Sequence, residues 1–144
     1  MEQKLTLKGL EYDAKVLIAW GESISGNKKI TEFLMKNFTE LGVFHYALRN
    51  ETRARNWLLE NKKPHLMALI NGIEGNKEAL HWLKQNGFFL LHEMALVGDG
   101  DNDAFERLLK TDFKIFALLA KKMETIKNEI DARNNDPHYY KNSN

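Results

Sequence analysis

The chain repeats itself with a period of about 25 residues, and this period restricts the possible folds more than any other feature. In one recurring step a bulky apolar residue precedes a leucine, and successive copies lie at nearly equal intervals. The copies are Phe33-Leu34, Trp57-Leu58, Trp82-Leu83 and Leu108-Leu109. A period of about 25 residues fits two helices of three turns each and two tight turns. Because one such hairpin cannot bury its apolar stripe alone, the period predicts a stack of hairpins that share a core.

The residue types between these steps favour helix over strand. Leu, Ala, Lys and Glu are common, alternating runs of Val, Ile and Thr are missing, and only Pro64 and Pro137 interrupt the chain. We expect an all-α, α-solenoid-like stack of short helical hairpins, residues 1–132, with a longer C-terminal helix and a polar C-terminal tail, residues 133–144. The expected helices span residues 7–23, 28–37, 42–49, 51–60, 65–73, 76–85, 88–97, 103–110 and 112–132.

Two acidic residues are expected to begin helices. Asp103 and Glu106 have the spacing of a capping box, in which a side chain at the start of a helix accepts a hydrogen bond from a free amide. Asp112 is placed to do the same for the last helix, where its charge also faces the positive end of the helix dipole.

Part of the chain resembles a known repeat family. The segment Pro64-His65-Leu66-Met67-Ala68-Leu69, with Gly72 after it, and the segment Glu78–Gly87 look like a degenerate ankyrin repeat. The likeness covers residues 42–113. It implies a protein-binding scaffold without chemistry of its own, in which the histidine at position 65 or 92 ties successive turns together by hydrogen bonds.

The sequence departs from the ankyrin pattern in two places. His65 and Leu66 are swapped relative to the family order, and the next helix follows Gly87 almost at once. That spacing leaves no room for the β-hairpin of the family. We therefore expect α-hairpin repeats that are similar to ankyrin only in their helices.

Charge is unevenly distributed along the chain, although the formal net charge is only +1. Residues 26–63 hold eight Lys and Arg against four Glu, a balance of +4, whereas residues 64–112 hold four against eight, a balance of −4. Arg49, Arg53 and Arg55 cluster in the basic half and are candidate contacts for a charged partner. Nucleic-acid binding through residues 26–63 is the alternative, but the pI near 7.9 is low for that function.

Candidate chemistry is sparse. The acidic segment Asp99–Asp103 begins like a calcium loop, but Ala104 and Lys110 stand where glycine and glutamate are needed. No two histidines have the helical spacing that would present both to one metal ion. We expect no catalytic residues, no metal and no cofactor. A small helical enzyme or ligand carrier is a further alternative, which requires a closed pocket that a repeat period does not reveal.

The last helix and the tail offer two further candidate contacts. Five apolar residues alternate at spacings of three and four along the helix and form a seam: Phe116, Leu119, Met123, Ile126 and Ile130. The seam either folds onto the last repeat or meets a partner or a second copy. Tyr139 and Tyr140 lie in the tail without an obvious core to join and are candidate secondary contacts.

The sequence alone does not identify a partner. Without cysteine it excludes disulfides and thiolate chemistry, and its first twenty residues hold no apolar signal core. No uncharged apolar stretch approaches the roughly 18 residues of a membrane span. We expect a cytoplasmic protein–protein interaction module, such as a small adaptor, inhibitor or immunity-type partner, without contact to a membrane.

Overall fold

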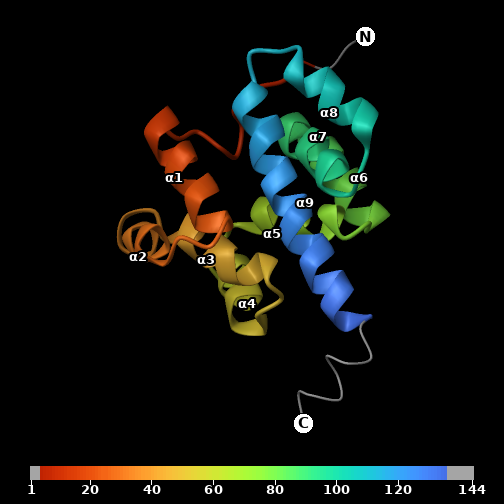
Figure 1. Ribbon diagram of the computed structural model, residues 1–144. Coiled ribbons are helices and arrows are strands. Elements are labelled where there is room, and N and C mark those ends of the chain that lie inside the picture. The colour runs from red at the N-terminus through yellow and green to blue at the C-terminus, as the bar shows by residue number, and fades with distance from the viewer. Residues whose placement is uncertain (1–3, 136–144) are drawn as a thin grey trace.

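The computed structural model describes residues 4–135, which fold into nine α-helices without a strand. The predicted all-α fold of packed helical hairpins is thereby confirmed (Figure 1). The helices are α1 (Ala14–Ile24), α2 (Lys28–Asn37), α3 (Thr39–Leu48), α4 (Thr52–Glu60), α5 (Pro64–Ile73), α6 (Lys77–Gln85), α7 (Phe89–Gly98), α8 (Asn102–Leu109) and α9 (Lys114–Asn134). No helix in this range combines the length and apolar character needed to cross a bilayer.

The predicted period holds in the structure. The helices α1, α3, α5, α7 and α9, which we call the inner helices, begin at one constant interval: at Ala14, Thr39, Pro64, Phe89 and Lys114. The helices α2, α4, α6 and α8 alternate with them and are the outer helices. Each outer helix packs on the inner helices before and after it, and within residues 4–135 no two outer helices pack on each other. This arrangement leaves grooves between successive outer helices.

Buried leucines give the register of the outer helices. Leu34, Leu58, Leu83 and Leu108 recur at nearly constant spacing and are all at most 1% exposed. The last copy of the repeat was therefore predicted one residue too late, because Leu109 is only half-buried. Two adjacent leucines hide the register in the sequence. As a result Arg107, not Leu108, holds the position of Trp57 and Trp82.

Each inner helix is followed by a turn that sets the next outer helix. Gly26, Asn50, Gly75 and Gly100 have positive φ angles there, a conformation in which glycine and asparagine are favoured. In three of the turns the next side chain accepts a hydrogen bond from the outer helix: Asn27 from Ile30 at 3.2 Å, Asn76 from Ala79 at 3.0 Å and Asp101 from Ala104 at 3.0 Å.

The two predicted acidic caps are wrong. The cap of α8 is Asp101, two positions before Asp103, because Gly100 completes the turn and the helix begins at Asn102. The last helix begins at Lys114, and the residue before it, Phe113, makes no side-chain cap. The amide of Phe113 instead donates to the hydroxyl of Thr111 at 3.0 Å, so that Asp112 is not needed.

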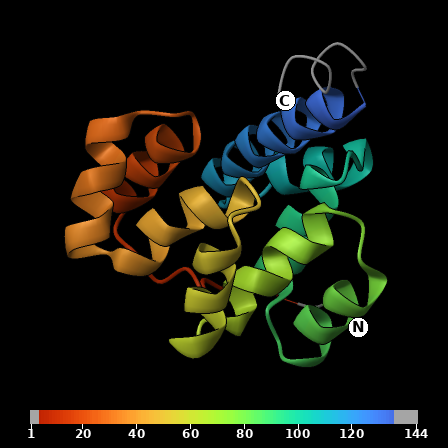
Figure 2. The same cartoon turned by 90° about the horizontal axis from the view of Figure 1, so that it is seen from below.

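The first helix begins later than predicted, at Ala14 rather than near residue 7. Residues 4–13 form a segment without helix that turns at Gly9, whose φ of +89° lets it pack closely against Leu91 and Phe88. Leu10 is fully buried, and Tyr12 donates to the Glu40 carboxylate at 2.6 Å. Leu5, Leu10 and Tyr12 thus pack in or against the core without forming a helix, whereas Leu7 is exposed. In Figure 2 the red segment runs from α1 toward the green and teal helices.

The last helix, α9, crosses the centre of the molecule between α1 and α7 and also contacts α3, α5 and α8 (Figure 1). Its seam is used inside the chain: Phe116, Leu119, Met123 and Ile126 are buried, and Ile130 is half-buried against the core. Self-association through these five residues is therefore not supported, since they already pack on the chain's own helices. Arg133 and Asn134 extend α9 beyond the predicted end at residue 132.

Replacement of Lys62 by glycine should stabilise the fold. Lys62 ends α4 with a φ of +61°, and Gly87 ends α6 in the same way, one repeat later, with a φ of +77°. A side chain in this region costs about 1 kcal/mol, so we expect Lys62→Gly to raise the free energy of unfolding by about 0.5–1 kcal/mol. Urea denaturation measures the change. Gly87→Ala is the matched control and should be destabilising; a lower stability of Lys62→Gly would contradict this account of the turn.

Candidate functional site

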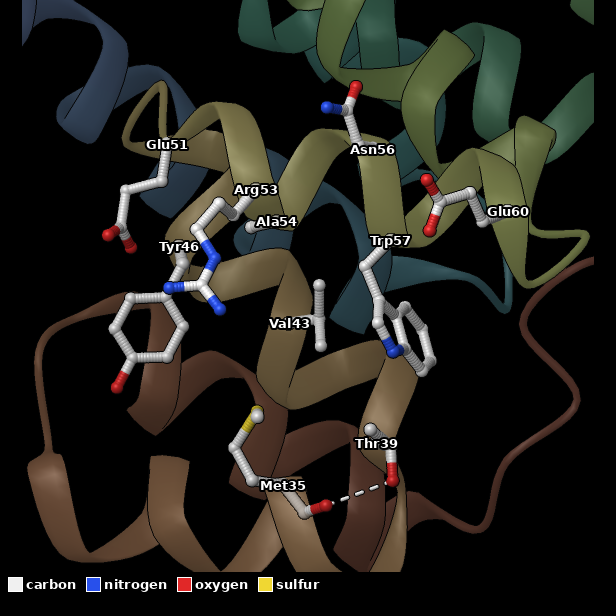
Figure 3. A pocket seen from close by; sticks show the side chains of 10 residues that line it. All are labelled: Met35, Thr39, Val43, Tyr46, Glu51, Arg53, Ala54, Asn56, Trp57 and Glu60. Carbon is white, nitrogen blue, oxygen red and sulfur yellow. Dashed lines mark hydrogen bonds between the residues drawn. The ribbon is translucent and has the colours of Figure 1, made fainter.

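A groove of about 690 Å³ lies over α3, on the side where α2 and α4 diverge (Figure 3). We call it the α3 groove. Its floor and walls come from the end of α2, the outward side of α3 and the whole of α4. The lining residues are Met35, Thr39, Val43, Tyr46, Glu51, Arg53, Ala54, Asn56, Trp57 and Glu60.

The floor of the groove is apolar and partly open to solvent. Val43 lies at the bottom and is 5% exposed, whereas Met35 and Tyr46 are 37% and 38% exposed. Trp57 is half-buried and forms one wall. Thr39 donates its hydroxyl to the Met35 carbonyl oxygen at 2.9 Å, which fixes the junction of α2 and α3 at the groove's edge. Large apolar side chains that remain exposed in this way are typical of binding surfaces.

Of the three predicted arginines, the structure places only Arg53 at the groove. Arg53 is exposed and extends beside the ring of Tyr46 (Figure 3). Its neighbours Arg49 and Arg55 turn away and bond to the chain itself. The sequence suggested one face for Arg49 and Arg53 because they lie four positions apart. The turn at Asn50 separates them, since Arg49 follows the end of α3 and Arg53 lies in α4.

Arg49 ties the end of α1 to α3. Its guanidinium donates to the Ile24 carbonyl oxygen at 2.7 Å and to the His45 carbonyl oxygen at 3.0 Å. The Nδ1 atom of His45 lies 2.7 Å from the Ser23 carbonyl oxygen. Because a carbonyl only accepts, this nitrogen carries the proton and donates. Arg49 and His45 therefore satisfy the two last carbonyl groups of α1, which is a structural role.

Arg55 ties α3 to α5. Its Nε atom donates to the Ala47 carbonyl oxygen at 3.0 Å, and its two terminal nitrogens pair with the Glu74 carboxylate at 3.2 and 3.0 Å. The side chain is 18% exposed. A bidentate pair of this kind holds the arginine in one orientation and leaves it little freedom to meet a partner.

The remaining predicted contacts, and the groove residues that the sequence analysis missed, can now be named. Tyr139 and Tyr140 lie outside the described residues, and their role stays a prediction. Met35, Tyr46 and Trp57 were missed as groove residues. Trp57 was interpreted as part of the repeat core, and Met35 and Tyr46 belong to no sequence motif. The one signal that could have identified these two residues is an apolar side chain on the outward side of a helix.

Three histidines lie partly buried within the fold, and the register of the repeats does not place His65 and His92 at equivalent positions. The ring of His65 stacks on Phe88, with the centroids 5.2 Å apart and the planes 8° from parallel. Burial lowers the pKa of His45, His65 and His92 below the usual 6.5. Neutral rings in such places serve packing and hydrogen bonding, and within residues 4–135 no group of three His, Cys, Asp or Glu is placed to hold a metal ion.

The acidic segment after α7 is used for local structure. Asp101 caps α8, and Asp99 pairs with Lys127 of α9 at 2.8 Å. These two contacts fasten the turn between α7 and α8 to its neighbours. The carboxylates do not converge on a common point, in agreement with the absence of a metal cluster among the described residues.

No protein-family model matches the chain, no curated protein is similar to it, and no solved structure matches it. What the α3 groove is suited to bind is therefore argued from its residues and geometry. Its floor is apolar and its rim carries Glu51, Arg53, Asn56 and Glu60 (Figure 3). Such a surface is suited to a peptide or a protein whose apolar side chain packs on the floor and whose polar groups meet the rim.

Substitution of Arg49 should destabilise the protein, whereas substitution of Arg53 should not. Arg49→Ala leaves two carbonyl groups of the α1–α3 contact without their charged donor, which costs about 2 kcal/mol. Arg53→Ala removes an exposed side chain and should change the free energy of unfolding by less than about 0.5 kcal/mol. Urea denaturation of both variants checks this expectation. Equal losses would contradict the different roles given to the two arginines.

The fold should lose stability as the pH falls below about 6.5. In the unfolded chain the three histidines titrate near 6.5, whereas burial lowers their pKa in the folded protein. Between the two pKa values the unfolded state binds more protons, so that stability rises with pH. Unfolding in urea at about pH 7.5 and about pH 5.5 measures the loss. His65→Gln should reduce it; His81→Gln, at an exposed position, is the control and should leave it unchanged.

Proposed function

We propose that this protein is a protein–protein interaction module that binds a partner in the α3 groove. The carrying observation is that Met35 and Tyr46 lie beside the Trp57 wall in one groove of about 690 Å³. Ile18, Phe33 and Leu118 are more exposed than either, but they do not line this groove. Tyrosine, tryptophan and arginine are also the residues that most often dominate the energy of protein interfaces. The groove brings Tyr46, Trp57 and Arg53 together.

The arginines have separate parts in this proposal. Arg53 contacts the partner from the wall of the groove, because it is exposed and lies beside Tyr46. Arg49 and Arg55 hold α3 against α1 and α5 and thereby keep the groove in place. Tyr139 and Tyr140 remain proposed secondary contacts. The resemblance to ankyrin helices agrees with a binding scaffold, although it covers only residues 42–113.

Nucleic-acid binding through residues 26–63 is less well supported. Glu51 and Glu60 line the α3 groove together with Arg53, and their carboxylates would repel phosphate groups. The other two arginines of the cluster bond to carbonyl oxygens and Glu74. A continuous positive surface, which phosphate recognition requires, is therefore not built from these three side chains.

Affinity capture with matched variants tests the proposal. The double variant Tyr46→Ser/Arg53→Glu changes two exposed groove residues, and Asn71→Ser/Glu78→Lys changes the same two positions one repeat later. From the native lysate we expect the wild-type protein and the second variant to retain one discrete protein. The groove variant should retain at least about tenfold less of it.

The other outcomes decide against the proposal. A partner that the groove variant retains at the wild-type level binds elsewhere on the molecule. Bound material that is lost on nuclease treatment or at moderate salt indicates nucleic acid instead. Circular dichroism of the three proteins verifies that the substitutions leave the helices intact.

A further inference from the structure

The α3 groove is one of three equivalent grooves, which lie over α3, α5 and α7. Their volumes are about 690, 260 and 220 Å³. Corresponding lining residues stand one repeat apart. The corresponding sets are Thr39, Pro64 and Phe89; Val43, Ala68 and Glu93; Tyr46, Asn71 and Leu96; and Trp57, Trp82 and Arg107.

The chain's own N-terminal segment lies in the third of these grooves. Leu5, which belongs to no helix, forms part of the wall of the α7 groove and packs against the core. Lys8 fixes the segment nearby, since its ammonium group donates to the Asn86 carbonyl oxygen and lies 4.6 Å from the centre of the Phe88 ring. The fold thus shows that a segment without helix can pack along this type of groove through an aliphatic side chain, with a lysine nearby.

The α3 groove offers more apolar surface to such a segment. In the α7 groove Glu93 and Arg107 face each other as an ion pair at 3.2 Å. At the corresponding positions the α3 groove has Val43 and Trp57. Replacement of an ion pair by two apolar side chains turns a polar wall into one that favours burial of a large aliphatic group.

Polar and charged side chains on the rim of the α3 groove favour some ligands over others. Figure 3 shows Glu51 and Glu60 at opposite ends of the groove and Asn56 on the rim between them. Both carboxylates are exposed, and neither has an ion-pair partner within residues 4–135. Two carboxylates against the single guanidinium of Arg53 leave the lining with an excess of negative charge, so that they are placed to attract a basic side chain. The amide of Asn56 both donates and accepts, as an extended peptide backbone with unpaired N–H and C=O groups requires.

We propose that the α3 groove recognises an extended segment of a partner protein in which a leucine-like side chain lies next to a lysine or arginine. This inference rests on the proposed function and names its ligand. The aliphatic side chain is buried between Val43, Met35 and Trp57. The basic side chain reaches Glu60 or Glu51.

Selection from a displayed library of random peptides, about twelve residues long, tests the proposal. The wild-type protein is the bait, and binders of Met35→Ser/Tyr46→Ser are discarded, because this variant removes two exposed apolar residues and keeps the charges of the groove. We expect the selected peptides to share one Leu, Ile or Met close in sequence to a Lys or Arg, without helical spacing of apolar residues. Fluorescence anisotropy then measures the affinity of the best peptide, synthesised with a label.

Substitutions in both molecules verify the contacts. Replacement of the peptide's aliphatic residue by serine should weaken binding at least about tenfold. Glu60→Lys in the protein should weaken it about threefold at low salt and less at high salt, because salt screens exposed charges. Glu78→Lys, in the α5 groove, is the matched charge reversal and should leave the affinity unchanged.

The possible failures are distinguishable. Peptides that need the α3 groove but are acidic, or carry apolar residues at helical spacing, overturn this inference and leave the proposed function standing. Peptides that bind Met35→Ser/Tyr46→Ser equally well, or no enrichment at all, also overturn it. The proposed function itself fails only if the captured partner does not depend on Tyr46 and Arg53.

Discussion

The structure depends on the turn that follows each inner helix. A residue with positive φ ends the helix, and the next residue begins the outer helix, in three of the four turns with an Asn or Asp side chain as cap. Because such a turn can have only a few lengths, each inner helix begins at a nearly constant number of residues after the one before it. Asn50 is the one non-glycine among the four. Because the turns are alike, the grooves between successive outer helices are alike too.

Closure of the core decides which surface remains for binding. The long helix α9 packs on α1 and α7 and contacts α3 and α5, so its buried face supplies the core that a linear stack would leave open. The inner helices therefore have little apolar surface left toward the centre. The exposed apolar residues of the α3 groove lie on the outward side instead, where no outer helix covers α3 between α2 and α4.

Much of the fold follows from the sequence, because the repeat is strong. The period, the alternation of two helices and the long last helix were all predicted from recurring apolar pairs. The register of α8 and the start of α1 were predicted less well. Leu108-Leu109 offers two equally apolar choices, and Leu10, which was assigned to the first helix, is buried from a segment without helix. The seam of α9 was recognised, but spacing within one helix does not say which surface covers it.

The site was predictable only in part, for a similar reason. Arg49, Arg53 and Arg55 are alike in the sequence, and their different roles depend on carbonyl groups and a carboxylate from distant positions. Ile24, whose carbonyl oxygen accepts from Arg49, and Glu74, which pairs with Arg55, belong to the neighbouring repeats on either side. Arg53 lacks such a neighbour among residues 4–135 and remains exposed. The distinction appears only when successive repeats are placed side by side.

The three grooves separate what the scaffold requires from what binding requires. Leu34, Leu58, Leu83 and Leu108 keep one residue type because each fills the same buried position. The groove positions differ from repeat to repeat, since no packing demand fixes them. The α7 groove is lined by the Glu93–Arg107 ion pair and by the chain's own Leu5. The α5 groove is small, and the α3 groove is wide with an apolar floor. The binding properties of this fold therefore depend on a few outward side chains, while the turns and the leucines hold them in place.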